Sequence, residues 1–170
     1  MASDDALIHQ TINLYGLALD ARRWDLFAQV FTPELHADYR PGGVWHDLVT
    51  FTADFARLHD RYDHTQHAVS NHVIRVDGRE ATAFSYVAWR LAVTSEDEWR
   101  GREGSAWYDD LLVRTEAGWR ICDRRCRVTW SQPIASSGAA DRAQSSFSRL
   151  PVEKNCPRVL APGTPRRACP

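Results

Sequence analysis

The chain has 170 residues, of which 44% are hydrophobic and 25% charged, and its formal net charge is -1. This balance is typical of one soluble globular domain, and it argues against a nucleic-acid-binding protein, which normally has a basic face. No apolar run approaches the roughly 20 residues that cross a bilayer, and the acidic start MASDDAL lacks the pattern of a secretory signal. We therefore expect a cytoplasmic protein whose partners include neither nucleic acid nor a membrane.

The N-terminal segment has the periodicity of an amphipathic helix. Ser3, followed by two aspartates, is typical of a helix N-cap with acids in the first turn. Apolar residues then recur at helical spacing, which predicts a helix over residues 4–20. Asp20 lies about 80° around that helix from Ile12, so it falls at the edge of the buried stripe rather than opposite it.

The remaining elements follow from periodicity and turn residues. In chain order, the sequence predicts a helix over 24–31 that ends before Thr32-Pro33-Glu34, a strand over 35–39, a helix over 48–59, and strands over 66–76, 80–95, 105–115 and 119–130. The turn signals between the last four strands are Asp77-Gly78, Gly101 with Gly104, and Ala117-Gly118. Three helices followed by four strands in hairpin succession indicate an α+β fold, with the helices packed on one antiparallel sheet.

The composition changes near the C-terminal end of the last predicted strand. Residues 132–170 are rich in Ser, Ala and Pro and have little periodicity. We therefore expect a folded domain over residues 1–131 and a poorly ordered tail over 132–170.

Three histidines, His64, His67 and His72, lie within the stretch DHTQHAVSNH and raise two chemical alternatives. A metal site is disfavoured because residues three or five apart on a strand point to opposite faces, and because no cysteine or second histidine pair completes a tetrahedral set. A proton-transfer site needs one histidine with a carboxylate that fixes its tautomer. His67 and Asp20 are candidates for that pair. From the residues alone, the alternative of a solvated Asp20 and a core His67 stays open.

Four segments of the sequence together resemble one known family. They are LDARRWDLFAQVFTPE (19–34), TQHAVSN (65–71), VDGREATAFSY (76–86) and YDDLLVRTEAGWRICDR (108–124). Their order and spacing are similar to those of the SnoaL-like branch of the nuclear transport factor 2-like superfamily, which includes polyketide cyclases, scytalone dehydratase and hexachlorocyclohexane dehydrochlorinase. The resemblance covers residues 4–130 and implies a cone-shaped α+β barrel made of a curved antiparallel sheet and three N-terminal helices.

The resemblance also implies an aspartate–histidine dyad. In scytalone dehydratase and the dehydrochlorinase, an aspartate at the end of the first helix supports a histidine base, and these positions match Asp20 and His67. Scytalone dehydratase has a tyrosine that polarises the substrate oxygen through water, and this position matches Tyr39. Two departures argue against scytalone as the substrate: the tyrosine before the aspartate is Leu19 here, and residues 81–95 contain no second histidine. A dyad acting alone is closer to the dehydrochlorinase pattern.

Four further residues are candidates for substrate contact. Tyr108 and Asp110 alternate on one strand face, in a Y-x-D pattern that is frequent near the pocket in this branch. Asp110 either binds a substrate hydroxyl or pairs with Arg124. Asn71 is expected on the same strand face as the histidine base, where it either contacts the substrate or closes a backbone hydrogen bond. Trp89 lies on a face with other apolar residues, as a core residue or as a wall of the pocket.

These features predict a lyase of the dehydratase type, without cofactor or metal, acting on a small hydrophobic or polyketide-like carbonyl compound of secondary metabolism. His67 removes a proton next to the carbonyl, Tyr39 or a water stabilises the enolate oxygen, and the imidazolium protonates the departing hydroxide. An ordinary imidazole pKa of ~6.5 suits a base at neutral pH. The same dyad also serves an isomerase or an aldol-type cyclase, and this fold also serves non-catalytic ligand-binding or dimerisation modules. The resemblance further implies a homodimer or higher homo-oligomer.

Overall fold

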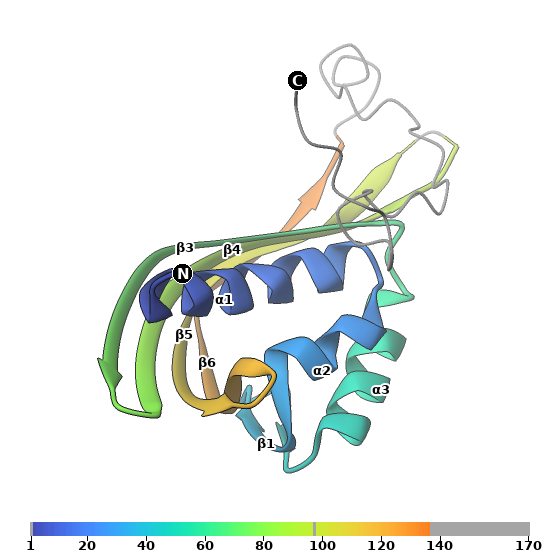
Figure 1. Cartoon of the computed structure of the whole chain (residues 1–170). Coiled ribbons are helices and arrows are strands. Elements are labelled where there is room, and N and C mark those ends of the chain that lie inside the picture. Colours follow the sequence, from blue (N-terminus) through green and yellow to red (C-terminus); the bar gives the residue numbers. More distant parts are fainter. Residues whose placement is uncertain (1, 97, 137–170) are drawn as a thin grey trace, which may run out of the picture. The chain divides into compact units, whose positions relative to one another are not determined.

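The computed structural model describes residues 2–96 and 98–136. Along the chain, the helical segments precede most of the strands. The helical segments are α1 (Asp4–Asp20), the 3-10 turn η1 (Trp24–Leu26), α2 (Phe27–Val30) and α3 (Leu48–His59). The strands are β1 (Phe31–Asp38), β2 (Val44–Trp45), β3 (His64–Asp77), β4 (Glu80–Thr94), β5 (Trp99–Thr115) and β6 (Gly118–Ala135). β3 and β4 arch over α1, and α2 and α3 lie on the same side of the sheet (Figure 1).

Helix α1 confirms the prediction for residues 4–20. Ser3 caps the helix by accepting a hydrogen bond from the backbone N–H of Ala6 at 3.3 Å, and two aspartates occupy the first turn, near the positive end of the helix dipole. The buried residues recur every three or four positions and are Ile8, Thr11, Ile12, Tyr15, Gly16, Ala18 and Leu19. The chain leaves the helix at Arg22, which has a left-handed backbone with φ 54°.

The next predicted helix, over residues 24–31, is divided into η1 and α2. The strand β1 already begins at Phe31, so the chain is extended before it reaches Pro33. The pairing of β1 with β6 is irregular around Pro33, and its missing N–H therefore interrupts no regular ladder.

Helix α3 has the bounds that the sequence predicts. Asp47 caps it by accepting a hydrogen bond from the backbone N–H of Thr50 at 2.8 Å. Its buried residues, Phe51, Phe55 and His59, are four apart and form one stripe that faces the interior.

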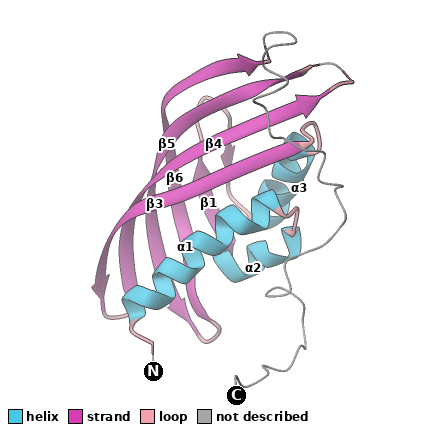
Figure 2. Ribbon diagram, turned by 90° about the horizontal axis from the view of Figure 1, so that it is seen from above, coloured by secondary structure: helices cyan, strands magenta, loops and turns pink. Residues whose placement is uncertain are grey.

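The six strands form one sheet in the order β2-β1-β6-β5-β4-β3. β3 to β6 are joined as antiparallel hairpins, whereas β1 runs parallel to β6 and carries the two-residue β2 at the edge. Figure 2 shows the helices crossing one face of this curved sheet. The α+β class and the packing of three helices on one curved sheet are confirmed. The sheet is mixed and not closed, because β1, which α3 separates from the hairpin run, joins β6 in the parallel direction.

Two glycines that the sequence analysis assigned to a turn, Gly101 and Gly104, lie inside β5. The connection from β4 is instead closed by Ser95, whose backbone N–H donates to the carbonyl oxygen of Glu98 at 2.7 Å. A β-carbon on Gly101 would lie 1.9 Å from the carbonyl oxygen of Leu91. The glycine therefore marks a close approach of two backbones rather than a turn.

The predicted boundary at residue 131 is too early, because β6 continues to Ala135 and so includes residues that composition alone assigned to the tail. The rest of that predicted tail, residues 137–170, lies outside the described residues. Within the described part of the chain, no helix is long and apolar enough to cross a membrane.

Aromatic rings fill the layer between the helices and the sheet. Phe51 and Phe55 of α3 lie 4.2 Å apart between ring centroids, and Phe51 also packs on Phe27 and Phe31 at 5.8 and 5.4 Å. These rings are almost fully buried. This core holds α3 against the start of β1 and leaves the last turn of α3 beside the end of α1.

Candidate active site

The carboxylate of Asp20 holds His67 at two points. Oδ1 of Asp20 lies 2.8 Å from Nδ1 of the imidazole, and Oδ2 accepts a hydrogen bond from the backbone N–H of His67 at 2.7 Å. Because an ionised carboxylate only accepts, Nδ1 carries the proton and Nε2 of the neutral ring is left as an acceptor. The side chains of Asp20 and His67 are 26% and 9% exposed. The structure thus brings together the two residues that the resemblance pairs, 47 positions apart.

A close contact between α1 and β3 explains how the pair meets. A β-carbon on Gly16 would lie 3.0 Å from the carbonyl oxygen of His67, so the helix backbone rests almost directly on the strand. Asp20 is one helical turn further along α1 on the same side, which carries its carboxylate to the imidazole. The edge position that the sequence predicts for Asp20 agrees with its partial exposure.

The charge state of Asp20 follows from its partners. Burial by itself would raise the pKa of Asp20, but the hydrogen bonds and charge interaction with His67, with a hydrogen bond from Thr65, bring that pKa below its ordinary value. The carboxylate is therefore ionised at neutral pH and stabilises a positive charge on the imidazole.

Arg22 holds the elements around the dyad together, a role that the sequence analysis missed. Its guanidinium donates hydrogen bonds to the carbonyl oxygens of Leu19, His59 and Tyr62 at 3.0, 2.9 and 3.1 Å, and to Oγ1 of Thr65 at 2.8 Å. These bonds join the ends of α1 and α3 to the start of β3. The left-handed backbone that aims the side chain inward has no signal in the sequence, because left-handed turns normally use glycine.

His59 is a second histidine beside the dyad, also missed by the sequence analysis. It is the last residue of α3, is 2% exposed, and has its ring centroid 5.5 Å from that of His67. Nδ1 lies 2.7 Å from the carbonyl oxygen of Phe55. Burial lowers the pKa of His59 to about 4, so the ring is neutral at physiological pH. Its four-residue spacing from Phe55 on an apolar stripe was the available signal.

Tyr39 lies in a hydroxyl cluster rather than against the dyad. Its hydroxyl is 3.0 Å from that of Tyr15, and the ring of Tyr108 packs on both. Burial raises the pKa of Tyr39 and Tyr108 well above the ordinary value and that of Tyr15 to about 12, so all three remain protonated donors. Ring contacts lead from Tyr39 through Phe55 and His59 to His67.

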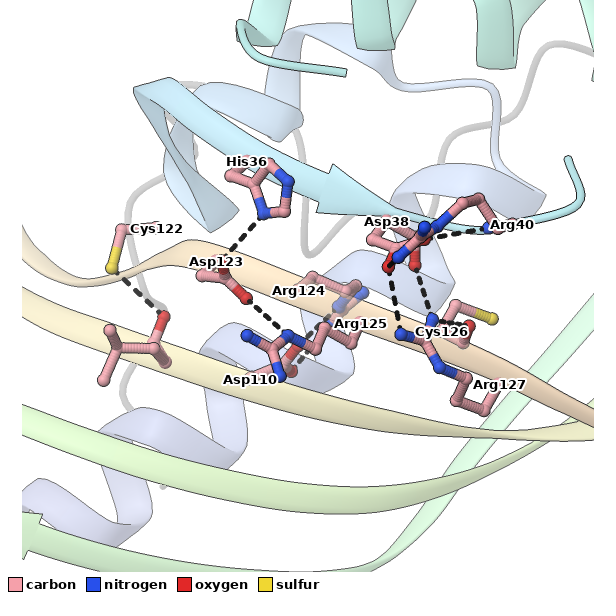
Figure 3. A network of polar contacts seen from close by, with 11 residues as sticks. His36, Asp38, Arg40, Asp110, Cys122, Asp123, Arg124, Arg125, Cys126 and Arg127 are labelled. Atoms are coloured by element: carbon pink, nitrogen blue, oxygen red, sulfur yellow. Dashed lines mark hydrogen bonds and ion pairs between the residues drawn. The ribbon is translucent and has the colours of Figure 1, made fainter. Parts of the chain in front are cut away.

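Asp110 and Arg124 form a fully buried ion pair (Figure 3). Nε and Nη2 of Arg124 donate to the two carboxylate oxygens, each at 2.7 Å. Burial alone would lower the pKa of Arg124, but the charge of Asp110 raises it well above the ordinary value. The guanidinium carbon also lies 4.4 and 4.1 Å from the ring centroids of Tyr15 and Tyr108. The sequence left two roles open for Asp110, substrate binding and pairing with Arg124. The structure shows the ion pair, because both carboxylate oxygens accept hydrogen bonds from Arg124.

Asn71 does not share a face with His67, and this prediction is wrong. Asn71 has φ 53° and lies where the pairing of β3 with β4 shifts register, which is a β-bulge. The extra residue leaves Asn71 exposed and turns His72 toward α1, where its ring nitrogens lie 2.8 Å from Oγ of Ser85 and 3.2 Å from Oδ1 of Asn13. A period of two cannot continue through a bulge.

Trp89 lies beside the dyad on the inner face of the sheet. It is the cross-strand partner of His67 on one side and of Gly104 on the other. A β-carbon on Gly104 would lie 2.7 Å from the indole, so the glycine makes room for the ring. Trp89 is half-buried, which agrees with a wall of the site better than with a core residue.

Among the described residues, no group of three His, Cys, Asp or Glu side chains is placed to hold a metal ion. A cavity of about 490 Å³ lies toward the β4–β5 connection, beyond the row of His67 and Trp89. It is lined by Tyr62, Val93, Arg100, Gly101, Arg102, Pro133, Ile134 and Ala135.

Comparison with known proteins gives matches that cover the described domain. A family model described as a SnoaL-like domain matches residues 1–125. The uncharacterised protein Rv2910c of Mycobacterium tuberculosis is 32% identical over 123 residues, which make up 72% of this chain and 83% of that protein.

Solved structures share the fold. The Kfla4162 protein from Kribbella flavida superposes with a TM-score of 0.70 at 24% identity, over 76% of this chain and 93% of that chain. A candidate scytalone dehydratase from Novosphingobium aromaticivorans gives 0.68 at 20% identity, over 79% and 89%. A hexachlorocyclohexane dehydrochlorinase (LinA) gives 0.67 at 14% identity, over 79% and 91%. At these identities the likeness establishes the architecture.

Proposed function

This chain belongs to the SnoaL-like domain family of the nuclear transport factor 2-like superfamily, and we propose that it is a cofactor-free lyase that dehydrates a small hydrophobic or polyketide-like carbonyl compound. The observation that carries the proposal is the two-point hold of Asp20 on His67. A carboxylate that binds both the ring and the backbone of a histidine fixes the tautomer and the direction of its free nitrogen.

The reaction begins with proton transfer to His67. Its Nε2 removes a proton from the carbon next to the substrate carbonyl, and the ionised Asp20 stabilises the imidazolium that forms. The same imidazolium then gives its proton to the hydroxyl group that departs from the neighbouring carbon. The products are an unsaturated carbonyl compound and water, and the dyad returns to its starting state.

Two further groups assist in the proposed reaction. Trp89, directly across the strand pair from His67, provides a flat apolar wall for the substrate. Tyr39, hydrogen bonded to Tyr15, donates toward a developing enolate oxygen through an intervening water.

The same dyad suits an isomerase or an aldol-type cyclase, in which the carbanion is reprotonated or attacks an internal carbonyl. All three reactions share the first step, so they differ only in the fate of the carbanion. A ligand-binding module without catalysis would not need a carboxylate 2.8 Å from Nδ1 of a buried histidine.

The test incubates the protein with a panel of small β-hydroxy ketones in deuterated water. NMR follows exchange of the proton next to the carbonyl, and ultraviolet absorbance follows the unsaturated product. We expect both signals from the wild-type protein and a loss of about a hundredfold or more in His67→Ala. Exchange without the unsaturated product would select the isomerase or cyclase alternative.

The matched control is His46→Ala, which removes an exposed histidine. It should retain wild-type rates, and circular dichroism should show that His67→Ala is folded. Full activity in folded His67→Ala would contradict the proposal.

The proposal includes a homo-oligomer in the cytoplasm. The sheet face opposite the helices carries exposed aromatic side chains, among them Tyr86 and Trp107, which are cross-strand partners and are each 45% exposed. Light scattering on the wild-type protein and on Trp107→Glu tests the assembly, and a wild-type monomer would remove this part of the proposal.

A further inference from the structure

The imidazole of His59 uses one of its nitrogens and leaves the other without a partner among the described residues. Nδ1 lies 2.7 Å from the carbonyl oxygen of Phe55, and because a carbonyl oxygen only accepts, Nδ1 must carry the proton. In the neutral ring Nε2 is then a lone-pair acceptor. This atom is buried and has no hydrogen-bond partner within the described part of the chain.

A buried acceptor without a hydrogen bond lowers the stability of the folded protein. A buried polar atom without a partner destabilises a protein by about 1–3 kcal/mol, and such atoms are rare in native structures. Phenylalanine at this position would keep the ring contacts with Phe55 and Trp24 without that cost. The unpaired nitrogen therefore requires a donor that residues 2–96 and 98–136 do not supply.

The position of Nε2 indicates where that donor comes from. The two nitrogens of an imidazole point in widely different directions, so Nε2 points away from the α3 backbone that Nδ1 faces. The ring of His67 packs on His59 at 5.5 Å between centroids. Since Nδ1 of His67 is held by Asp20, both of these neighbouring rings have an unprotonated Nε2.

We infer that Nε2 of His59 accepts a hydrogen bond from a hydroxyl group of the substrate, next to the carbon that His67 deprotonates. The inference rests on the proposed function for placing the substrate at His67. It adds that the substrate is a hydroxylated carbonyl compound, with an alcohol or phenol O–H that is kept through the reaction.

The hydroxyl that His59 binds is not the one expelled. A departing hydroxyl must receive a proton, whereas an acceptor on its O–H would hinder departure. His59 is neutral at physiological pH and its N–H is committed to Phe55, so it does not donate. His59 is therefore a substrate-binding residue that recognises a second oxygen.

The test compares two probes of similar shape, phenol, which donates a hydrogen bond, and toluene, which does not. Protein labelled with ¹⁵N at histidine is titrated with each probe, and NMR reports both the Nε2 signal of His59 and the dissociation constant. We expect phenol to shift that signal toward the value of a hydrogen-bonded nitrogen and to bind about tenfold more tightly than toluene. In His59→Phe the two probes should bind equally.

An unchanged Nε2 signal with phenol up to its solubility limit, or equal binding of phenol and toluene to the wild-type protein, overturns the inference. If His59→Phe does not fold, the two measurements on the wild-type protein still test whether His59 accepts a hydrogen bond from a hydroxyl group. The readout requires no turnover, so it is separate from the test of the lyase. A phenol-selective His59 in a protein without proton-exchange activity would remove the proposed function and leave the hydroxyl site.

Discussion

Gly16 of α1 and His67 of β3 are so close that a β-carbon on the glycine would lie 3.0 Å from the carbonyl oxygen of the histidine. This contact brings the end of α1, and with it Asp20, to the imidazole. A helix held a few tenths of an ångström further away would lengthen hydrogen bonds that are now 2.7 and 2.8 Å. The geometry of the dyad therefore depends on a residue without a side chain.

Gly16→Val should weaken both folding and the dyad. The added methyl groups have no space between α1 and β3, and overpacking of this kind costs about 1–3 kcal/mol. Urea unfolding measures the free energy of unfolding, and the proton-exchange assay measures the dyad. Gln10→Val, at an exposed position of α1, is the control for a β-branched residue in the helix. Equal effects of the two substitutions would contradict the close contact.

Arg22→Ala should lower the free energy of unfolding by about 2–3 kcal/mol, because it removes four hydrogen bonds from a charged donor to groups of α1, α3 and β3. Arg22→Gly should cost about 1 kcal/mol less, since glycine adopts the φ of 54° without strain. Arg61→Ala, at an exposed nearby position, should change the stability little. If Arg22→Ala and Arg61→Ala unfold at the same urea concentration, the role of Arg22 is wrong.

Breaking the Asp110–Arg124 pair should be more harmful than replacing it. Asp110→Asn leaves a buried arginine without its counter-charge and should lower the free energy of unfolding by about 3–5 kcal/mol. The double substitution Asp110→Leu with Arg124→Met should be more stable than either single change. The surface pair Arg90–Glu103 is the comparison, and its coupling should be much smaller because solvent screens it. A double-mutant cycle gives both coupling energies, and similar values would refute the prediction.

The stability should fall as the pH is lowered from 6.5 to 4 because of His59. Burial lowers its pKa to about 4 in the folded protein, whereas an unfolded histidine has an ordinary value near ~6.5. Between these values the unfolded chain binds a proton that the folded protein does not, so unfolding is favoured by up to about 3 kcal/mol at the acidic end. Asp20 acts at lower pH. Because its pKa is depressed in the folded protein, the stability that it gives is present above the ordinary carboxyl pKa and is lost as the pH falls from that value through the folded one.

Urea unfolding at several pH values between 7 and 4 measures this dependence. His59→Phe should show a flatter profile than the wild-type protein, and the difference between the two profiles isolates His59 from other histidines such as His72. Parallel profiles would mean that His59 is not buried as a neutral ring.

The comparison of sequence and structure separates local from tertiary information. α1 begins after Ser3, which the sequence predicts as its cap and which caps the helix in the structure. The predicted bounds of α3 are also confirmed. The position of Asp20 at the edge of its stripe follows from the helical repeat alone. Where the chain departs from a regular repeat, prediction failed: the bulge at Asn71 reversed the strand faces, and glycines of β5 that suggested a turn serve a close approach.

The sequence by itself determined the α+β class, the bounds of the main helices and the family resemblance that names Asp20 and His67, because these depend on short-range periodicity and on motifs. Only the tertiary structure decided that Arg22 joins three elements, that Asp110 is an ion-pair partner and that His59 lies beside His67. Those relationships connect residues that are far apart in the chain, and they depend on how closely α1, α3 and the sheet pack. No local sequence pattern encodes how closely these elements pack.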